Sequence, residues 1–424
     1  MSISKTNLKA FLFLSLSVIL VWCVASNFII PLYYYNGMND LKLDISFFYS
    51  LFFLIYFLFL ILSLKYKSST DFFLATIFFL CVFNSNIFYS VSGITDSKLV
   101  LIKNLIFFIF FFILYNFNKL SFKLNFQIPK NLFGVVNLKV EVAITILLIV
   151  LFVIVYQKLN LSFSAHGNYE FRIDGRDKIK GLLGYYWNGG LNGLAPILGF
   201  ISIYNKRFSY YFFAIAFALA GYAFIGVKTS ISLVIFMGYL GWFFSNTKNS
   251  NFLKFFYLIF FFSSLICLLE YLFFNQSYVG DYFIRRIFLT VSQNQMYFIE
   301  FISTNLTDFK SIIFGLYLDK SESFVIGNLY YNNELSNANS NTFLSEIIRN
   351  GLVGFFINLI FIIFFLSFSN YCFRVTKHHV WFALPTLYAL LIFEQNYKTA
   401  FLSSGVLFTI ILLFIFKNKR FKKV

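Results

Sequence analysis

Arginine side chains occur in two polar stretches of an otherwise apolar sequence. Arg172 and Arg176 lie four residues apart in the first stretch, and Arg285 and Arg286 are adjacent in the second, which ends near Arg349. A guanidinium is a planar group with several N–H donors, and this geometry suits phosphate oxygens. The arginines therefore predict a site that holds a phosphate or pyrophosphate group and stabilises the negative charge that develops as such a group departs.

Carboxylates accompany these arginines and suit a second role. A transfer onto a hydroxyl group needs a base that takes the hydroxyl proton. The candidate bases are Glu170, Asp174 and Asp177 in the first stretch, with Asp281, Glu300 and Glu346 in the second. The competing interpretation is that arginines and carboxylates only pair with one another, or that the arginines hold these stretches at lipid headgroups.

Motifs for several other chemistries are absent from the sequence, which contains no hydrolytic triad, P-loop, zinc motif or dinucleotide fingerprint. His378 and His379 are adjacent, but no third ligand is near them in the sequence. We interpret them as solvated loop residues rather than as a metal site. Neither a metal nor a cofactor is expected.

The composition places these stretches in a membrane protein. The chain has 424 residues, of which 59% are hydrophobic and only 12% charged, against about 25% charged in soluble domains. Its apolar residues form long runs, and about 20 such residues cross a bilayer as a helix. We predict an all-α polytopic membrane protein, a single membrane domain over residues 1–424 with about 12 transmembrane helices. The predicted spans are 10–30, 45–64, 71–91, 101–117, 140–157, 188–205, 208–226, 229–245, 255–274, 351–373, 380–396 and 400–416.

The sixth predicted span is unusual because it is rich in glycine and contains Pro196. Its small residues predict either a bent or broken helix that borders a wet cavity, or close packing of helices, and we favour packing. Charged residues are rare in the spans. We interpret Lys103, Lys228, Glu270 and Glu394 as side chains near helix ends that extend to the membrane surface. Rare charges weaken the case for a proton- or ion-coupled transporter.

The basic residues predict the orientation of the chain. With both termini in the cytoplasm, the inner segments hold 19 of the 34 basic residues and only two of the 17 acidic ones, Asp71 and Glu141. Cytoplasmic loops of membrane proteins carry this excess of Lys and Arg. The charge is spread over short inner segments and forms no continuous groove, which argues against a nucleic-acid partner.

This orientation places two long loops outside the cytoplasm, a medium one at 158–187 and a large one at 275–350. Apolar residues from Phe283 to Ile302 recur at helical spacing, which predicts an amphipathic helix in the outer headgroup layer. Asn341 or Thr342 is the expected N-cap of the next span. Asn339 and Asn341 belong to an Asn- and Ser-rich segment whose side chains suit the hydroxyl groups of a sugar.

These features resemble those of bacterial O-antigen polymerases, which polymerise lipid-linked oligosaccharide repeat units. The similar features are the twelve-span layout, the medium loop with Arg172 and Arg176, the large loop before the last three spans, and the segment NANSNTFLSEIIRNGLVGF. The layout covers the whole chain, and the likeness at the level of residues covers some 20 to 40 positions.

The resemblance implies a glycosyltransferase of the bacterial inner membrane. Such an enzyme moves a growing glycan from one undecaprenyl pyrophosphate carrier onto a new lipid-linked repeat unit at the periplasmic face, during lipopolysaccharide biosynthesis. It also implies that loop arginines contact the substrate, for which Arg172 or Arg176 and Arg285 or Arg286 stand in the matching positions. The expected partners are the lipid-linked oligosaccharide, the bilayer and a chain-length regulator protein.

Two other functions fit the same layout. An O-antigen ligase would transfer the glycan to lipid A-core, but that family is expected to use a histidine in its long loop, and residues 275–350 contain none. A flippase or other non-enzymatic transporter of lipid-linked sugars would be expected to have short loops, internal repeats and charges within its spans.

Overall fold

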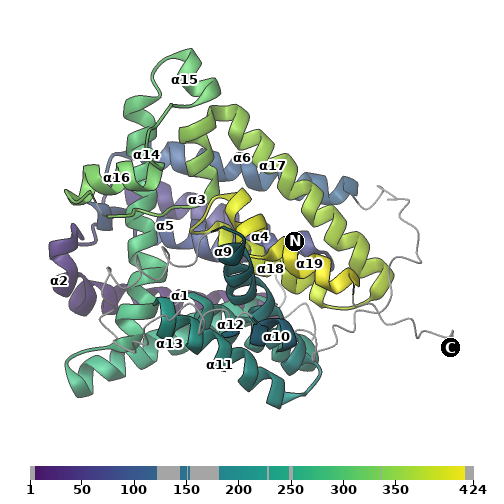
Figure 1. The fold of residues 1–424 in the computed structure, drawn as a ribbon. Coiled ribbons are helices and arrows are strands. Elements are labelled where there is room, and N and C mark those ends of the chain that lie inside the picture. The colour runs from purple at the N-terminus through teal and green to yellow at the C-terminus, as the bar shows by residue number, and fades with distance from the viewer. Residues whose placement is uncertain are drawn as a thin grey trace. The chain divides into compact units, whose positions relative to one another are not determined.

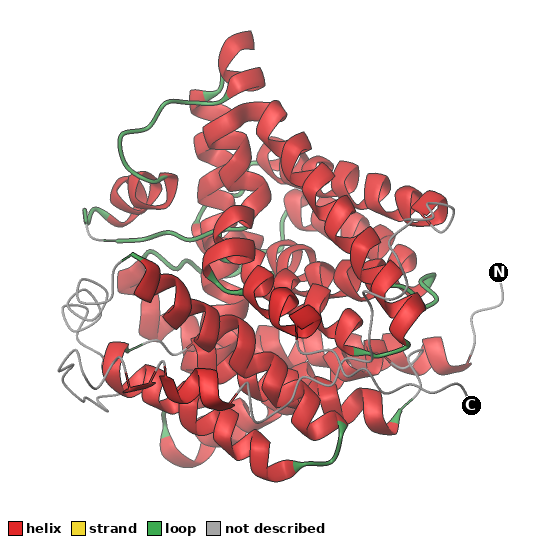
Figure 2. Cartoon of the chain, turned by 45° about the vertical axis from the view of Figure 1, so that its right-hand side comes forward, coloured by secondary structure: helices red, strands yellow, loops and turns green. Residues whose placement is uncertain are grey.

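The computed structural model describes most of the chain, and all the regular elements in the described part are helices (Figure 1). The described residues are 5–121, 144–149, 151–152, 181–226, 229–247, 252–334 and 336–415. Figure 2 shows helices joined by loops, and no strand occurs in these ranges. The all-α class is therefore confirmed.

Six helical stretches are long and apolar enough to cross a membrane. They are Ser15–Asn36, Ile45–Leu62, Ser69–Ile87, Ser97–Phe117, Phe252–Phe274 and Thr342–Thr376. Their length and composition indicate a multi-pass membrane protein. Helices also overlap the other predicted spans, although the range 140–157 is described only at residues 144–149 and 151–152. The count of twelve spans and the orientation remain predictions.

The chain packs into two compact units, and each combines segments that are distant in sequence. Unit 1 consists of residues 1–121, 250–364 and 393–396, and unit 2 of 122–249, 365–392 and 397–424. The large predicted loop, 275–350, belongs to unit 1. The medium loop, 158–187, belongs to unit 2, where only its last residues are described.

Side-chain caps define where two spanning helices of unit 1 begin. The Asp44 side chain accepts a hydrogen bond from the backbone N–H of Phe47, and α3 runs from there over Ile45–Leu62. Ser68 and Asp71 form a reciprocal capping box at the start of α4 (Ser69–Ile77). Each cap satisfies N–H groups that the first helical turn leaves without partners. Asp71, one of the two acidic residues assigned to the cytoplasmic side, thus has a local structural role.

The predicted amphipathic helix exists, but its middle does not present a polar face to water. It comprises the π-helical segment η8 (Gly280–Leu289) and α14 (Thr290–Asn305), which packs against α5 (Asn84–Ile87) and α6 (Ser97–Ser121). In α14 the polar residues Ser292 to Gln295 are buried together with the apolar ones. The expected interfacial position is therefore wrong for the middle of α14, which is enclosed by protein, and remains a prediction for η8.

The remainder of the large loop forms short helices before it enters a spanning helix. These are α15 (Phe309–Phe314) and α16 (Glu322–Tyr331), and they precede α17 (Thr342–Thr376). Gly351 breaks the helical backbone of α17 with φ 61° and ψ −154°. A Cβ at Gly351 would lie 2.4 Å from the backbone carbonyl carbon of Ile313. The backbone of α15 therefore lies against the break, and it fixes the first turns of α17 as a separate short helix.

Unit 2 is built around one glycine-rich helix at the sixth predicted span. Its consecutive parts are α9 (Leu182–Asn188), η6 (Gly189–Leu194) and α10 (Ala195–Tyr204), with a π-helical stretch in η6 instead of a break. A Cβ at Gly193 would lie 2.5 Å from the carbonyl oxygen of Gly405. Backbones approach this closely only where a side chain is missing, so close packing of helices is confirmed. The neighbouring helices are α11 (Phe208–Ile225), α12 (Thr229–Asn246), α18 (Val380–Ile392) and α19 (Val406–Ile415).

Candidate functional site

The residues predicted from the medium loop lie outside the described part of the chain. They are Glu170, Arg172, Asp174, Arg176 and Asp177. Their roles as bases and as phosphate contacts therefore remain predictions. The structure does describe all the predicted residues of the large loop, and it assigns them to different environments within unit 1.

Arg285 is occupied by a neighbouring carboxylate. Its Nε donates a hydrogen bond to Asp281 Oδ1 at 2.6 Å, one helical turn earlier. The Tyr33 hydroxyl donates to the same oxygen, and the guanidinium lies 4.2 Å from the centre of the Tyr33 ring. Partial burial raises the pKa of Asp281, but the bonds from Tyr33 and Arg285 outweigh it and hold this pKa below its ordinary value. Asp281 and Arg285 therefore form the ion pair that the competing interpretation expects.

Arg286 differs from its neighbour because it is exposed and has no hydrogen bond or ion pair to a described residue. Its charge acts on two groups nearby, lowering the pKa of both Asp281 and Tyr331. Burial is the larger influence on Tyr331 and raises the pKa of that phenol overall. Among the described arginines of the large loop, Arg286 is the one whose guanidinium is free to bind an anion.

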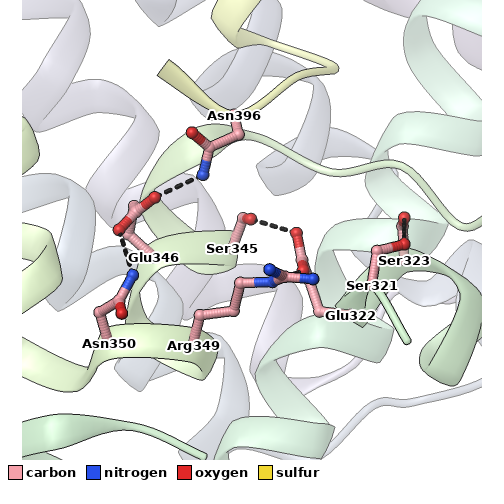
Figure 3. A network of polar contacts seen from close by, with 8 residues as sticks. All are labelled: Ser321, Glu322, Ser323, Ser345, Glu346, Arg349, Asn350 and Asn396. Carbon is pink, nitrogen blue, oxygen red and sulfur yellow. Dashed lines mark hydrogen bonds and ion pairs between the residues drawn. The ribbon is translucent and has the colours of Figure 1, made fainter. Parts of the chain in front are cut away.

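Arg349 belongs to a polar network that joins two helices (Figure 3). Its Nε donates to Glu322 Oε2 on α16, and Ser345 on α17 donates to the other oxygen of the same carboxylate. Glu322 is buried, whereas the Arg349 side chain is 41% exposed. This carboxylate has a cationic partner and a hydroxyl donor. It ties α16 to the first turns of α17.

Glu346, on the same short helix, is held in another way. It is only 2% exposed, and Asn350 Nδ2 donates to its Oε2 at 2.8 Å while Asn396 Nδ2 donates to its Oε1 (Figure 3). It forms no ion pair with a described residue. Two neutral amides therefore orient the carboxylate without supplying an opposite charge. Each oxygen keeps acceptor capacity beyond the one bond that it receives.

The two asparagines expected to contact sugars have different surroundings. The Asn339 side chain is exposed, and its backbone carbonyl accepts a hydrogen bond from Asn294 Nδ2 at 2.8 Å. Asn341 is buried, and its Oδ1 accepts from the backbone N–H of Leu344 at 3.2 Å. The predicted N-cap is thus confirmed at Asn341. Its Nδ2 has no partner among the described groups, so only Asn339 offers an exposed amide.

Aromatic rings pack α14 against α16, the helix that precedes the segment with these asparagines. Tyr297 on α14 stacks on Tyr330 of α16 with ring centres 4.2 Å apart, and the Tyr331 hydroxyl donates to Asn294 Oδ1 at 2.6 Å. Burial, together with a hydrogen bond to Glu300, raises the pKa of Tyr330. Glu300, a base candidate from the sequence, therefore lies near Tyr330.

Lys103 corrects the expectation that charged residues of the spans extend to the membrane surface. It is fully buried, and its Nζ donates to the backbone carbonyl of Ser85 on α5. An amine enclosed by protein has no route along a lipid-facing surface, so the snorkelling interpretation is wrong for this residue. The neighbouring Asn104 and the Asn84–Asn86 segment were the sequence signal that a polar interior was present.

The histidine pair also differs from its prediction. His378 and His379 are half-buried in unit 2, where the Tyr204 ring packs beside both of them. His378 Nδ1 accepts from the backbone N–H of Val380, and burial lowers the pKa of His378 to about 4. The pair is therefore a packed helix-start element rather than a solvated loop.

Comparison with known proteins identifies no relative. No family model matches the chain, and no curated protein or solved structure matches it. Within the described residues, no group of three or more His, Cys, Asp or Glu side chains could hold a metal ion. Inference about function therefore rests on the chemistry of the side chains in unit 1.

Proposed function

We propose that the chain is a membrane glycosyltransferase that joins lipid-pyrophosphate-linked oligosaccharide repeat units into a surface polysaccharide. The observation that carries this proposal is the environment of Glu346. It is a buried carboxylate, held by two neutral amides, on the short helix that precedes an apolar spanning helix. A carboxylate oriented in this way and not neutralised by a cation suits a general base.

The proposed reaction moves one glycosidic bond. A hydroxyl oxygen of the acceptor repeat unit attacks the anomeric carbon of the donor glycan, and the bond from that carbon to the pyrophosphate oxygen breaks. The pyrophosphate leaves on its lipid with the electron pair, and the hydroxyl proton passes to Glu346. Arg286 binds the departing pyrophosphate. Cationic donors stabilise the charge that grows there.

Three properties of the large loop support the proposal. It is folded into helices within unit 1, it contains both an unpaired arginine and an amide-held carboxylate, and it offers the exposed amide of Asn339. The layout also resembles that of O-antigen polymerases. In this proposal Asn339 binds the sugar, Arg286 binds the pyrophosphate, and Glu346 accepts the proton.

The test is deletion of the gene in its host and complementation with the wild-type sequence, followed by lipopolysaccharide electrophoresis. A polymerase predicts that the deletion strain makes core with a single repeat unit and that complementation restores long chains. Core without any repeat unit would instead indicate a ligase or a flippase and would reject the polymerase.

Lys103 supports a second candidate function, a transporter of lipid-linked sugars. Ionisable residues enclosed within a spanning region commonly mark a substrate or proton pathway, and Lys103 is such a residue. The same electrophoresis separates the two functions. A transporter predicts that the deletion strain lacks even the single repeat unit.

A further inference from the structure

Lys103 has fewer partners than a buried amine requires. It is 0% exposed on α6, and its one described hydrogen bond goes to the backbone carbonyl of Ser85. An ammonium group has three N–H donors, and Lys103 forms no ion pair with a described residue. A charged amine in a protein interior is strongly unfavourable without a counter-charge. The described residues supply none.

Three asparagines on the same two helices leave their amide oxygens unpaired. Asn84 and Asn86 flank Ser85, and Asn104 follows Lys103. Each of them donates its Nδ2 to the backbone carbonyl four residues earlier, and each Oδ1 has no partner. These bonds fix the orientation of the amides, because a flipped amide would place two oxygens against each other. The oxygens are thus real acceptors without donors.

Gln295 adds a further unpaired amide on a third helix. It is fully buried on α14, which packs against both α5 and α6, and neither its Nε2 nor its Oε1 has a partner. Buried polar groups without hydrogen bonds cost free energy, and each of them calls for a partner. The region where α5, α6 and α14 meet offers donors from Lys103 and Gln295. It offers acceptors from Gln295 and the asparagines.

We propose that this region binds the phosphate-bearing sugar head of a lipid-linked substrate. Phosphate oxygens accept hydrogen bonds and carry negative charge, so they match the amine of Lys103 and the amide N–H groups of Gln295. Sugar hydroxyls also donate, so they match the oxygens of Asn86 and Asn104. Water alone would satisfy the amides but would leave Lys103 without a counter-charge.

The depth of the site fits a lipid headgroup. Lys103 lies six residues after Ser97, the first residue of its span, which corresponds to about 9 Å along the helix. In the predicted orientation Ser97 is at the extracytoplasmic end. The inference names part of the substrate of the proposed function, and it holds equally for a transporter. It therefore does not depend on the transfer chemistry.

Binding is measured on the purified full chain in phosphatidylcholine nanodiscs, through the shift of its thermal unfolding midpoint. One arm adds inorganic pyrophosphate, and the other incorporates undecaprenyl pyrophosphate into the discs. We expect Lys103→Met to weaken binding by at least about 100-fold, because the ligand charge loses its partner. Lys98→Met on the same helix is the matched control. Lys98 is exposed, so its replacement should leave binding unchanged.

Gln295→Met provides a second test that does not remove a charge. Met has a similar volume, so the variant should fold at least as stably as the wild type, because two unpaired polar atoms disappear, yet bind the ligand more weakly. If Lys103→Met loses binding of both pyrophosphate and undecaprenyl pyrophosphate, the site recognises phosphate itself. If the wild type binds undecaprenyl pyrophosphate but not inorganic pyrophosphate, and Lys103→Met loses the lipid, the site recognises a lipid headgroup.

Two results would overturn the inference. The wild type could bind neither probe, or Lys103→Met could bind as well as the wild type. A chain that binds through Lys103 but fails to restore long chains in the electrophoresis would keep this site and reject the polymerase. The two failures are therefore distinguishable.

Discussion

Asp281 and Glu346 are both carboxylates of the large loop of unit 1, and their neighbours give them opposite properties. Asp281 has the guanidinium of Arg285 at 2.6 Å and a tyrosine hydroxyl on the same oxygen. Glu346 has two asparagine amides and no described cation. The first carboxylate is paired with a cation, whereas the second is oriented by neutral amides.

This difference shows how a base can be told from a structural ion pair. Both carboxylates were equal candidates by sequence, because each is an acidic residue in a loop that also contains arginines. Glu322 behaves like Asp281, since Arg349 is its partner. The cation-paired carboxylates have structural roles, and we propose the amide-held one as the base. The predictions below test this division from the largest expected effect to the smallest.

Glu346→Gln should reduce polysaccharide elongation by at least about 100-fold, because the amide cannot take the acceptor proton. Asp281→Asn should retain most of the activity, because Asp281 only holds the side chains of Arg285 and Tyr33. Elongation is measured in complemented deletion strains at equal expression of each variant. Equal losses in the two variants would remove the distinction between the carboxylates.

Gly351→Ala should destabilise the fold by about 1–3 kcal/mol from backbone strain, with a further loss because its Cβ would overlap the backbone of Ile313. The matched control is Gly181→Ala, which has a similar positive φ and open space around it. Thermal unfolding is measured for both variants. The difference between their losses of stability gives the cost of the overlap with Ile313. Equal destabilisation would show that contact with α15 does not fix the helix that carries Glu346.

Arg286→Ala should weaken binding of pyrophosphate by about 10-fold, the loss expected for one hydrogen bond to a charged group. Arg285→Ala should instead lower the free energy of unfolding by about 1–2 kcal/mol, because it leaves Asp281 without its ion pair. Titration with inorganic pyrophosphate and thermal unfolding are measured on each variant. Loss of pyrophosphate binding in Arg285→Ala but not in Arg286→Ala would contradict the conclusion that Asp281 occupies the Arg285 guanidinium.

Asp281 should also make the stability of the fold depend slightly on pH. Its pKa is lowered in the folded protein, so its ionised form stabilises the fold above the ordinary aspartate pKa of about 3.9. This contribution is lost as the pH falls through the lower folded value. The unfolding midpoint of the wild type should therefore drop more steeply below about pH 4 than that of Asp281→Asn. Identical curves would show that the ion pair adds no stability.

The sequence predicted the parts of the fold that follow from apolar periodicity. Long runs such as Phe47–Leu64 and Phe255–Leu269 became spanning helices, and the glycines of the sixth span became a close backbone contact at Gly405. The cap at Asn341 also followed from a local rule, because an asparagine before a helix bonds the N–H groups of its first turn. The helices and the cap depend on neighbours in the chain, whereas the glycine contact was predicted only as close packing and its partner, Gly405, lies in a distant segment.

The features that failed depend on contacts between distant segments. The burial of Lys103 accompanies the packing of α6 against α14, which lies nearly 200 residues away, and its hydrogen bond to Ser85 on α5. The environment of Glu346 includes Asn396, 50 residues later in the chain. Local patterns do not contain such pairings, so the sequence could name Glu346 as one of several bases but could not separate it from Asp281.

The central claim is that this chain transfers glycans with Glu346 as its base. Its most direct test is release of undecaprenyl pyrophosphate by the purified chain in nanodiscs supplied only with lipid-linked repeat units. The account predicts that one carrier is released for each glycosidic bond formed by the wild type, and that Glu346→Gln releases almost none while it still binds the substrate. Release by Glu346→Gln at the wild-type rate, or no bond formation by the wild type, would contradict it.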